Sequence, residues 1–346
     1  MPEPNLRQVK AAMNAELDKT QWHQIVRPYA RPESRRSTWQ LINTLVPYGV
    51  LWAAMVWSLS ISYWLTLALA IPTAAMRVRA FVLFHDCCHG SFYRSRKANS
   101  VIGGILGVLG FTPFHYWRHD HLVHHATAGN LDKRGTGDVP TWTVEEYRAA
   151  PWHKRAAYRI LRNPFFMFAI LPTLIFVLVR RFPTPGVDRN MVRSVIYNDL
   201  GLAAFYLPLG LLIGFKSLLL VEAPIVLLSA GAGVWLFYMQ HQFEGVYWTR
   251  AAEWDYLKAG LEGSSYYRLP ALLNWITGNI AFHHIHHVSP KIPNYNLAKC
   301  HRENPAFQVK PLTFRGSLTS CWLHLWDEAN RQLVGFGQIR GESRRP

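Results

Sequence analysis

Long uncharged stretches dominate the first part of the chain. From Ser37 to Met76 no side chain carries a charge, and this stretch is long enough for two helices of ~20 residues, the length that crosses a bilayer. A helix of this length in a soluble core normally has a polar face, which this stretch lacks. The pattern therefore predicts a helical hairpin in the membrane, with arms near 38–57 and 60–84.

A second apolar region predicts another pair of membrane helices, near 199–215 and 217–240, with a turn at Lys216. Two further apolar segments, 101–114 and 165–179, are shorter. At a rise of ~1.5 Å per residue they cannot cross a bilayer, so we expect each to insert only partly. The expected fold is all-α and multi-pass integral membrane, with about four transmembrane helices in two hairpins.

The charged residues predict the remaining parts and the orientation. We expect 1–36 to be a cytosolic N-terminal segment, 37–300 the membrane domain and 301–346 a cytosolic C-terminal tail. Arginines follow 165–179 closely, and Arg and Lys concentrate in cytoplasmic loops. If that side is cytoplasmic, the histidine-rich segments described below all form a cap on the cytosolic side. The expected location is therefore a membrane, with these segments facing the cytosol.

Composition supports a membrane protein and weighs against nucleic-acid binding. Charged residues make up 17% of the chain, against ~25% in a typical soluble domain. The net charge of +16 could indicate a nucleic-acid partner, but no basic run is combined with a nucleic-acid motif, so we expect no such partner. The cysteines, including the adjacent pair Cys87 and Cys88, form no disulfide framework, which fits a reducing, cytosol-facing environment.

Most of the 16 histidines fall into three clusters beside apolar segments. The first cluster is His85-Asp-Cys-Cys-His89, whose two rings lie on one face of a helix. The other two have the spacing i, i+3, i+4, so that each is expected to make half of a pocket. Neutral imidazole binds iron, copper, nickel and zinc, and this many nitrogens exceed the needs of one tetrahedral zinc. The clusters predict two metal ions held by His85, His89, His121, His124, His125, His283, His286 and His287.

Several residues near the clusters could support metal binding or could have a purely structural role. His241 lies where the fourth span should emerge, and its position alone leaves a ninth ligand and an interfacial histidine equally open. His119 and His284 are out of phase with their clusters, so we expect them to support the ligands or the structure. Asp86 and Asp132 could accept hydrogen bonds from ligand imidazoles or be capping or solvated carboxylates.

Other polar residues carry weaker expectations. Asp120 has the same two interpretations as Asp86 and Asp132. Asn279 could contact a metal through water or cap a helix. We expect the four isolated histidines at the surface: His23, His153, His301 and His324.

The sequence lacks a His-Glu-x-x-His metalloprotease motif, a Gly-x-Gly-x-x-Gly dinucleotide fingerprint and a Cys-x-x-Cys pair. A metal that changes oxidation state here would need electrons from another protein.

The three clusters, in this order and separated by hairpins, resemble those of the membrane fatty acid desaturase superfamily. Five segments in and around the clusters are most similar in sequence to those of bacterial acyl-lipid Δ12 (omega-6-type) desaturases. They are HDCCHGSF (85–92), WRHDHLVHHATAGNLD (117–132), FYMQHQFEGVYW (237–248), GSSYYRLP (263–270) and GNIAFHHIHHVSPKIPNYNL (278–297).

This resemblance implies two non-haem irons on the eight cluster histidines, with His241 as an additional ligand. It also implies that O2 is the co-substrate and that an acyl chain of a membrane lipid gains a cis double bond. The chain has no His-Pro-Gly-Gly motif of a fused cytochrome b5. The resemblance therefore implies a separate ferredoxin or cytochrome b5 as electron donor.

Two other functions use similar residues. A hydroxylase, or a carotenoid ketolase or hydroxylase, of the same superfamily would have nearly the same ligand set. A multi-pass metal transporter would also use histidines, but transport sites normally lie near the bilayer midplane, whereas these clusters lie at the ends of apolar segments. A non-enzymatic scaffold would explain none of the histidines.

Overall fold

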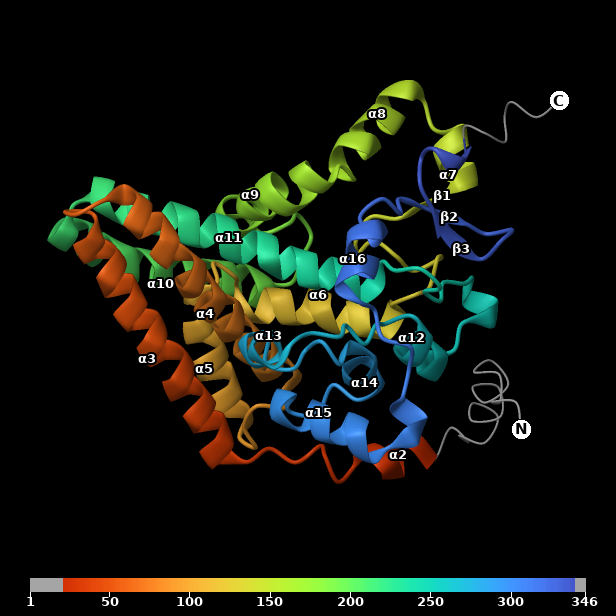
Figure 1. The fold of residues 1–346 in the computed structure, drawn as a ribbon, viewed down its shortest axis with the longest axis horizontal. Helices are drawn as coiled ribbons and strands as arrows, with labels where there is room; N and C mark the ends of the chain where they lie inside the picture. The colour runs from red at the N-terminus through yellow and green to blue at the C-terminus, as the bar shows by residue number, and fades with distance from the viewer. Residues whose placement is uncertain (1–20, 340–346) are drawn as a thin grey trace.

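Four long helices form two hairpins in the computed structural model, which describes residues 21–339 (Figure 1). The first hairpin pairs α3 (Ser34–Ser58) with α4 (Tyr63–His89), and the second pairs α10 (Arg189–Ile213) with α11 (Phe215–His241). All four are long and apolar enough to cross a membrane. This confirms the predicted helical class with about four spans.

The ends of these helices differ from the predicted arms for local reasons. Helix α4 continues without a break into the first histidine cluster and ends at Gly90, whose φ of 65° is left-handed and stops the helix. Helix α10 begins well before residue 199, because the Asp188 side chain accepts hydrogen bonds from the backbone N–H groups of Asn190 and Met191. Both helices therefore extend beyond their apolar parts.

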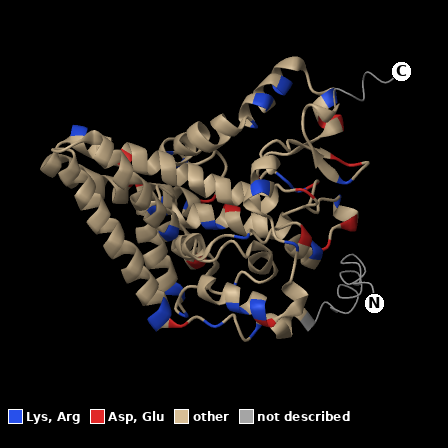
Figure 2. Ribbon diagram, viewed as in Figure 1, with Lys and Arg blue, Asp and Glu red and all other residues tan. Residues whose placement is uncertain are grey.

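The outer faces of the two hairpins are apolar and exposed. Only 11% of the apolar window of α10 is buried inside the protein, against 61% for α4. Leu211 and Leu212 are 78% and 80% exposed, and Figure 2 shows few charged residues along the long helices. An apolar face of this extent fits an apolar surrounding such as a bilayer, whereas α4 lies largely inside the bundle.

Two shorter helices connect the hairpins: α5 (Arg96–Leu109) and α6 (Phe114–Thr127). A Cβ added at Gly103 of α5 would lie 2.1 Å from the Phe114 ring, so the glycine permits the close contact between α5 and the start of α6. The turn between them includes Phe111 at a φ of 53°. The segment 101–114, predicted to insert partly, is thus most of α5 and the turn that follows it.

The segment before α10 is bent. It contains α7 (Val144–Ala149), α8 (Trp152–Leu161), the π-helix η1 (Phe166–Ile170), α9 (Leu171–Val177) and the 3-10 helix η2 (Val179–Arg181). Its second half turns by 60° relative to α8, at a break that contains Pro164. The segment 165–179 corresponds to η1 and α9, and its partial insertion stays a prediction.

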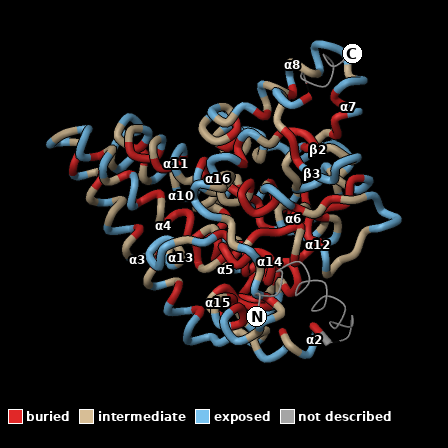
Figure 3. The backbone as a smooth tube through the Cα atoms, turned by 45° about the vertical axis from the view of Figure 1, so that its right-hand side comes forward, coloured by how far each residue is buried: buried red, intermediate tan, exposed pale blue. Residues whose placement is uncertain are grey.

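The rest of the chain forms a cap of short elements, where buried residues concentrate around α6, α12 and α14 (Figure 3). A small sheet joins distant segments, because β1 pairs in parallel with β2 (Trp142 opposite Leu325) and β2 pairs antiparallel with β3. The elements are α2 (Gln21–Val26), η3 (Ala251–Glu253), α12 (Tyr256–Glu262), α13 (Ala271–Ile276), α14 (His283–Val288), α15 (Asn294–Glu303), η4 (Pro305–Phe307), α16 (Phe314–Ser320), β1 (Trp142–Thr143), β2 (Leu325–Asp327) and β3 (Gln332–Val334). The predicted terminal segments lie partly outside the described residues.

Candidate metal centre

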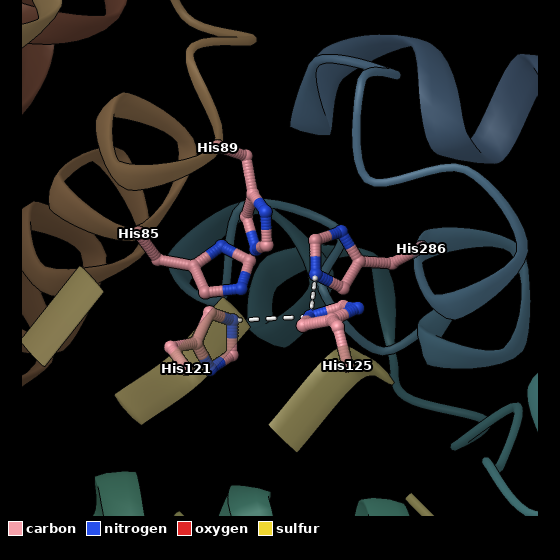
Figure 4. Close-up of side chains that lie close together, drawn as sticks. All are labelled: His85, His89, His121, His125 and His286. Atoms are coloured by element: carbon pink, nitrogen blue, oxygen red, sulfur yellow. Dashed lines mark hydrogen bonds between the residues drawn. The ribbon is translucent and has the colours of Figure 1, made fainter. Parts of the chain in front are cut away.

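Nine buried histidines converge at the cap end of the bundle and separate into two groups. Within each group one ring nitrogen from every residue lies within 4.8 Å of the others. Figure 4 shows the larger group, to which α4, α6 and α14 contribute. The five-histidine group is His85, His89, His121, His125 and His286, and the four-histidine group is His124, His241, His283 and His287.

The second and third clusters, on α6 and α14, each contribute to both groups, whereas both histidines of α4 belong to the five-histidine group. On α6, His121 and His125 belong to the five-histidine group, whereas His124 belongs to the other. On α14, His286 and His283 are divided in the same way. Residues four apart share a helix face, while a residue one position away points ~100° around the axis. The His-x-x-His-His spacing thus lets one helix contribute side chains to both groups.

The nitrogen separations fit ligands of a shared ion. Nε2 of His125 lies 3.1 Å from Nε2 of His121 and 3.1 Å from that of His286. Nε2 of His241 lies 3.0 Å from Nε2 of both His124 and His283. Two nitrogens that bind one ion, each at ~2.1 Å, lie ~3.0–3.4 Å apart. The separations therefore have the size expected for nitrogens that converge on one ion.

Several of these nitrogens have no other use in the described structure. Both ring nitrogens of His85, and Nε2 of His89 and of His287, are buried without a hydrogen-bond partner among the described residues. Each such buried atom costs ~1–3 kcal/mol unless something satisfies it. A metal ion in each group would satisfy one nitrogen of each of these rings, so the residues present fit a two-metal centre.

Burial also keeps the cap histidines in the form that binds metals. It lowers the pKa of His121, His125 and His283 well below the usual value, and the neighbouring imidazoles lower it further. The pKa values of His286 and His287 are lowered for the same reasons. These rings are therefore neutral at pH 7, and neutral imidazole is the ligand form.

Asp138 is a residue of this centre that we did not single out from the sequence. Its Oδ1 lies 2.5 Å from Nδ1 of His124, and its side chain is only 6% exposed. A carboxylate at Nδ1 leaves Nε2 free to face a metal. Its position in a glycine-rich loop soon after the second cluster is the signal that could have found it.

Of the other candidates, Asp86 lies nearest the ligands. Its Oδ1 is 3.5 Å from Nδ1 of His85, and its Oδ2 accepts hydrogen bonds of 2.8 Å from the backbone and side chain of Asn294. His284 is buried, but its Nε2 faces the carbonyl of Phe307 at 2.9 Å. Asn279 has a left-handed backbone at a φ of 58°, and its carbonyl accepts a hydrogen bond from the Phe282 N–H.

Two candidates, His119 and Asp132, lie outside both histidine groups. The His119 side chain is 52% exposed, because it projects from a different face of α6 than His121. The Asp132 side chain is 40% exposed and binds Arg250 at 2.7 Å. Asp120, considered with them, pairs with Arg180 at 2.9 Å.

A cavity of about 410 Å³ reaches both histidine groups. His85 and His121 line it from the five-histidine group, and His283 lines it from the four-histidine group. Most of its wall is apolar, from α4, α6, η1, α9 and α11, and Arg77 also lines it. Arg77 precedes His85 by two turns of α4, or ~12 Å, so the cavity extends from the histidines towards the membrane helices.

The comparisons with known proteins agree with this site. A family model described as "Fatty acid desaturase" matches residues 62–316, a range that contains both groups. The chain belongs to the fatty acid desaturase family and is a desaturase enzyme.

Similar proteins include a fatty acid desaturase of Bacillus subtilis (strain 168), 45% identical over 91% of this chain and 90% of that protein. The sn-1 oleoyl-lipid 12-desaturase of Synechocystis sp. is 29% identical over 78% of each chain. The sn-1 acyl-lipid omega-3 desaturase (ferredoxin) of the same organism is 30% identical over 63% of this chain and 61% of that protein.

Proposed function

We propose that this desaturase introduces a cis double bond into an acyl chain of a membrane lipid, with O2 as co-substrate and two irons as cofactor. The observation that carries the proposal is the cavity, because one apolar space of about 410 Å³ touches both histidine groups. A chain of methylenes lying in it would pass beside both groups at once. A metal transporter would need a polar path instead.

The two histidine groups support a di-iron centre. Nine buried histidines in two groups offer enough nitrogens for two ions, and imidazole suits iron. Iron bound there would supply the oxidant that removes two hydrogens from adjacent methylenes. The overall balance is –CH2–CH2– plus O2, two electrons and two protons giving –CH=CH– and two water molecules.

The protein's own residues position the substrate and keep water out. Phe81 and Phe176 line the cavity and give it an apolar wall. Trp117, which also lines it, stacks on the His121 ring with 4.3 Å between ring centroids. Phe237 lies 5.3 Å from the rings of both His124 and His241. These rings orient the histidines and shield reactive species from solvent.

The electron donor in this proposal is a separate ferredoxin, with a cytochrome b5 as the alternative. One Synechocystis relative carries ferredoxin in its name. The net charge of +16 would attract an acidic donor protein. We propose that the histidine cap faces the cytosol of a bacterial inner membrane, where such a donor is present.

We propose the 12 position for the double bond. The support is the Synechocystis 12-desaturase, which is similar over 78% of this chain. The omega-3 relative is 30% identical but over 63% of the chain. The position of the new double bond in the product distinguishes the two.

The test is the fatty acid profile, by gas chromatography–mass spectrometry, of a bacterial host that makes this chain together with a ferredoxin. We expect a new diene formed from endogenous monoenes, and no diene with the variant His124→Ala although that protein still inserts. A hydroxylated product would place the chain with the hydroxylases. An unchanged profile from an iron-loaded protein would indicate a carotenoid substrate. An unchanged profile without iron would favour the transporter, which metal flux in vesicles would then test.

A further inference from the structure

We propose that Asp138 is a positioning residue for the four-histidine group, through which the loop after α6 controls the metal in that group. This inference rests on the proposed di-iron centre. Asp138 is the carboxylate in direct contact with His124, at 2.5 Å between Oδ1 and Nδ1. The contact holds His124 with its proton on Nδ1 and its Nε2 turned to the partner ligands, 3.0 Å from Nε2 of His241.

The loop is shaped to bring Asp138 onto α6. Gly137 has a φ of 70°, and a Cβ there would lie 3.0 Å from the Asp120 carbonyl and 3.1 Å from the Cβ of His124. A side chain at this position would push the loop away from the helix. The second oxygen of Asp138 accepts a hydrogen bond from the Gly135 N–H at 3.3 Å, which orients the carboxylate.

The same loop is tied to the helix that carries His241. The Thr141 hydroxyl accepts a hydrogen bond from Gln242, the residue after His241, at 3.0 Å. The fully buried Arg162 donates to the Pro140 carbonyl at 3.0 Å and to the Gln242 side chain at 3.1 Å. Two ligands of the four-histidine group, on α6 and α11, are therefore joined through one loop.

The five-histidine group is supported differently. The carboxylate next to it, Asp86, lies 3.5 Å from His85 and is mainly engaged by Asn294. Nδ1 of His125 and of His286 have no hydrogen-bond partner among the described residues, as is also true of Nδ1 of His283 in the four-histidine group. Because that group has five histidines, metal binding by it should depend little on the orientation of any one imidazole ring. The four-histidine group has fewer ligands, so the loss of one oriented imidazole weakens it more.

The experiment compares iron content and spectra of the purified, iron-reconstituted full chain with those of Asp138→Ala and Asp138→Asn. Removing an outer carboxylate typically lowers metal affinity by ~10–100-fold. We expect the wild type to hold two irons and Asp138→Ala to lose about one, with one Mössbauer doublet of 57Fe diminished. Asp138→Asn keeps an oxygen that accepts from Nδ1, so it should retain more iron and show a lower kcat with little change in KM.

The matched control is Asp132→Ala, which removes an exposed carboxylate just before the same loop and should leave iron content and spectrum unchanged. Two irons with a wild-type spectrum in Asp138→Ala would overturn the inference. So would the loss of both irons together with a lower melting temperature, because that pattern indicates a general structural role. A wild type that holds no iron would instead refute the proposed function, so the two failures are distinguishable.

Discussion

At the scale of single residues, histidines outside the two groups show what burial does to an imidazole. His301 and His324, expected at the surface, are 7% and 5% exposed, so that expectation was wrong. Nδ1 of His301 contacts the Phe307 carbonyl at 3.1 Å. The ring of His324 stacks on Phe336, with 4.3 Å between centroids. Both are covered by chain segments that lack a regular hydrophobic period, so no local pattern marked them as buried.

Burial, aided by Arg162 and Arg159, lowers the pKa of His324 to about 4. In the unfolded chain this pKa is ~6.5. As the pH falls from ~6.5 to ~4 the unfolded state binds the proton first, so the stabilisation present above ~6.5 is progressively lost. We expect the protection factors of the amides in 324–336, which are corrected for the intrinsic pH dependence of hydrogen exchange, to be smaller at pH 5 than at pH 7.5. The variant His324→Phe keeps a stacked ring but cannot titrate, and an equal pH effect in it would assign the change to another group.

At the scale of elements, one buried ion pair connects the four long helices. Arg77 of α4 donates to Glu222 of α11 at 2.8 Å and to the Tyr206 hydroxyl of α10 at 3.0 Å. Trp52 of α3 donates to the other oxygen of Glu222 at 2.7 Å. Charges inside a membrane bundle are costly unless they are paired, so this pair fixes how the two hairpins pack.

Breaking this pair should destabilise the bundle. The variant Glu222→Gln leaves the Arg77 charge buried without its counter-ion, and we expect a loss of ~3–5 kcal/mol, seen as a lower melting temperature in detergent. The double variant Arg77→Met, Glu222→Leu removes both charges and should recover most of the loss. A double variant as unstable as the single one would show that packing, and not charge, is responsible.

At the scale of the whole molecule, the cavity joins the membrane helices to the cap. It is bounded by α4 and α11 from the two hairpins and by α6 and η1–α9 between them. No single element forms it, and its contact with both histidine groups depends on all of them. Its shape should therefore control the acyl chain independently of iron binding.

A substitution at Gly233 of α11 tests whether the shape of the cavity controls the acyl chain. Gly233 lines the cavity, and a Cβ there meets nothing within 4 Å. The variant Gly233→Leu places a branched side chain in the path of the acyl chain, where a displacement of ~1 Å can lower the rate ~10²-fold. We expect desaturation to fall by about that factor while iron content stays at the wild-type level. The control Gly49→Leu, on an exposed face of α3 with equal space around it, should remain active. Full activity of Gly233→Leu would place the substrate elsewhere.

The sequence by itself determined the features that depend on local spacing. Long uncharged stretches predicted the four long helices, and the His-x-x-His-His spacing identified the buried histidines of α6 and α14. Only the tertiary structure decided which histidines belong together, because His124 and His125 are adjacent in sequence yet lie in different groups. It also decided the partners: Asp138 reaches His124, and Asp132 does not. Spacing along one helix determines the direction of a side chain, whereas its partner depends on which distant segment packs against that face.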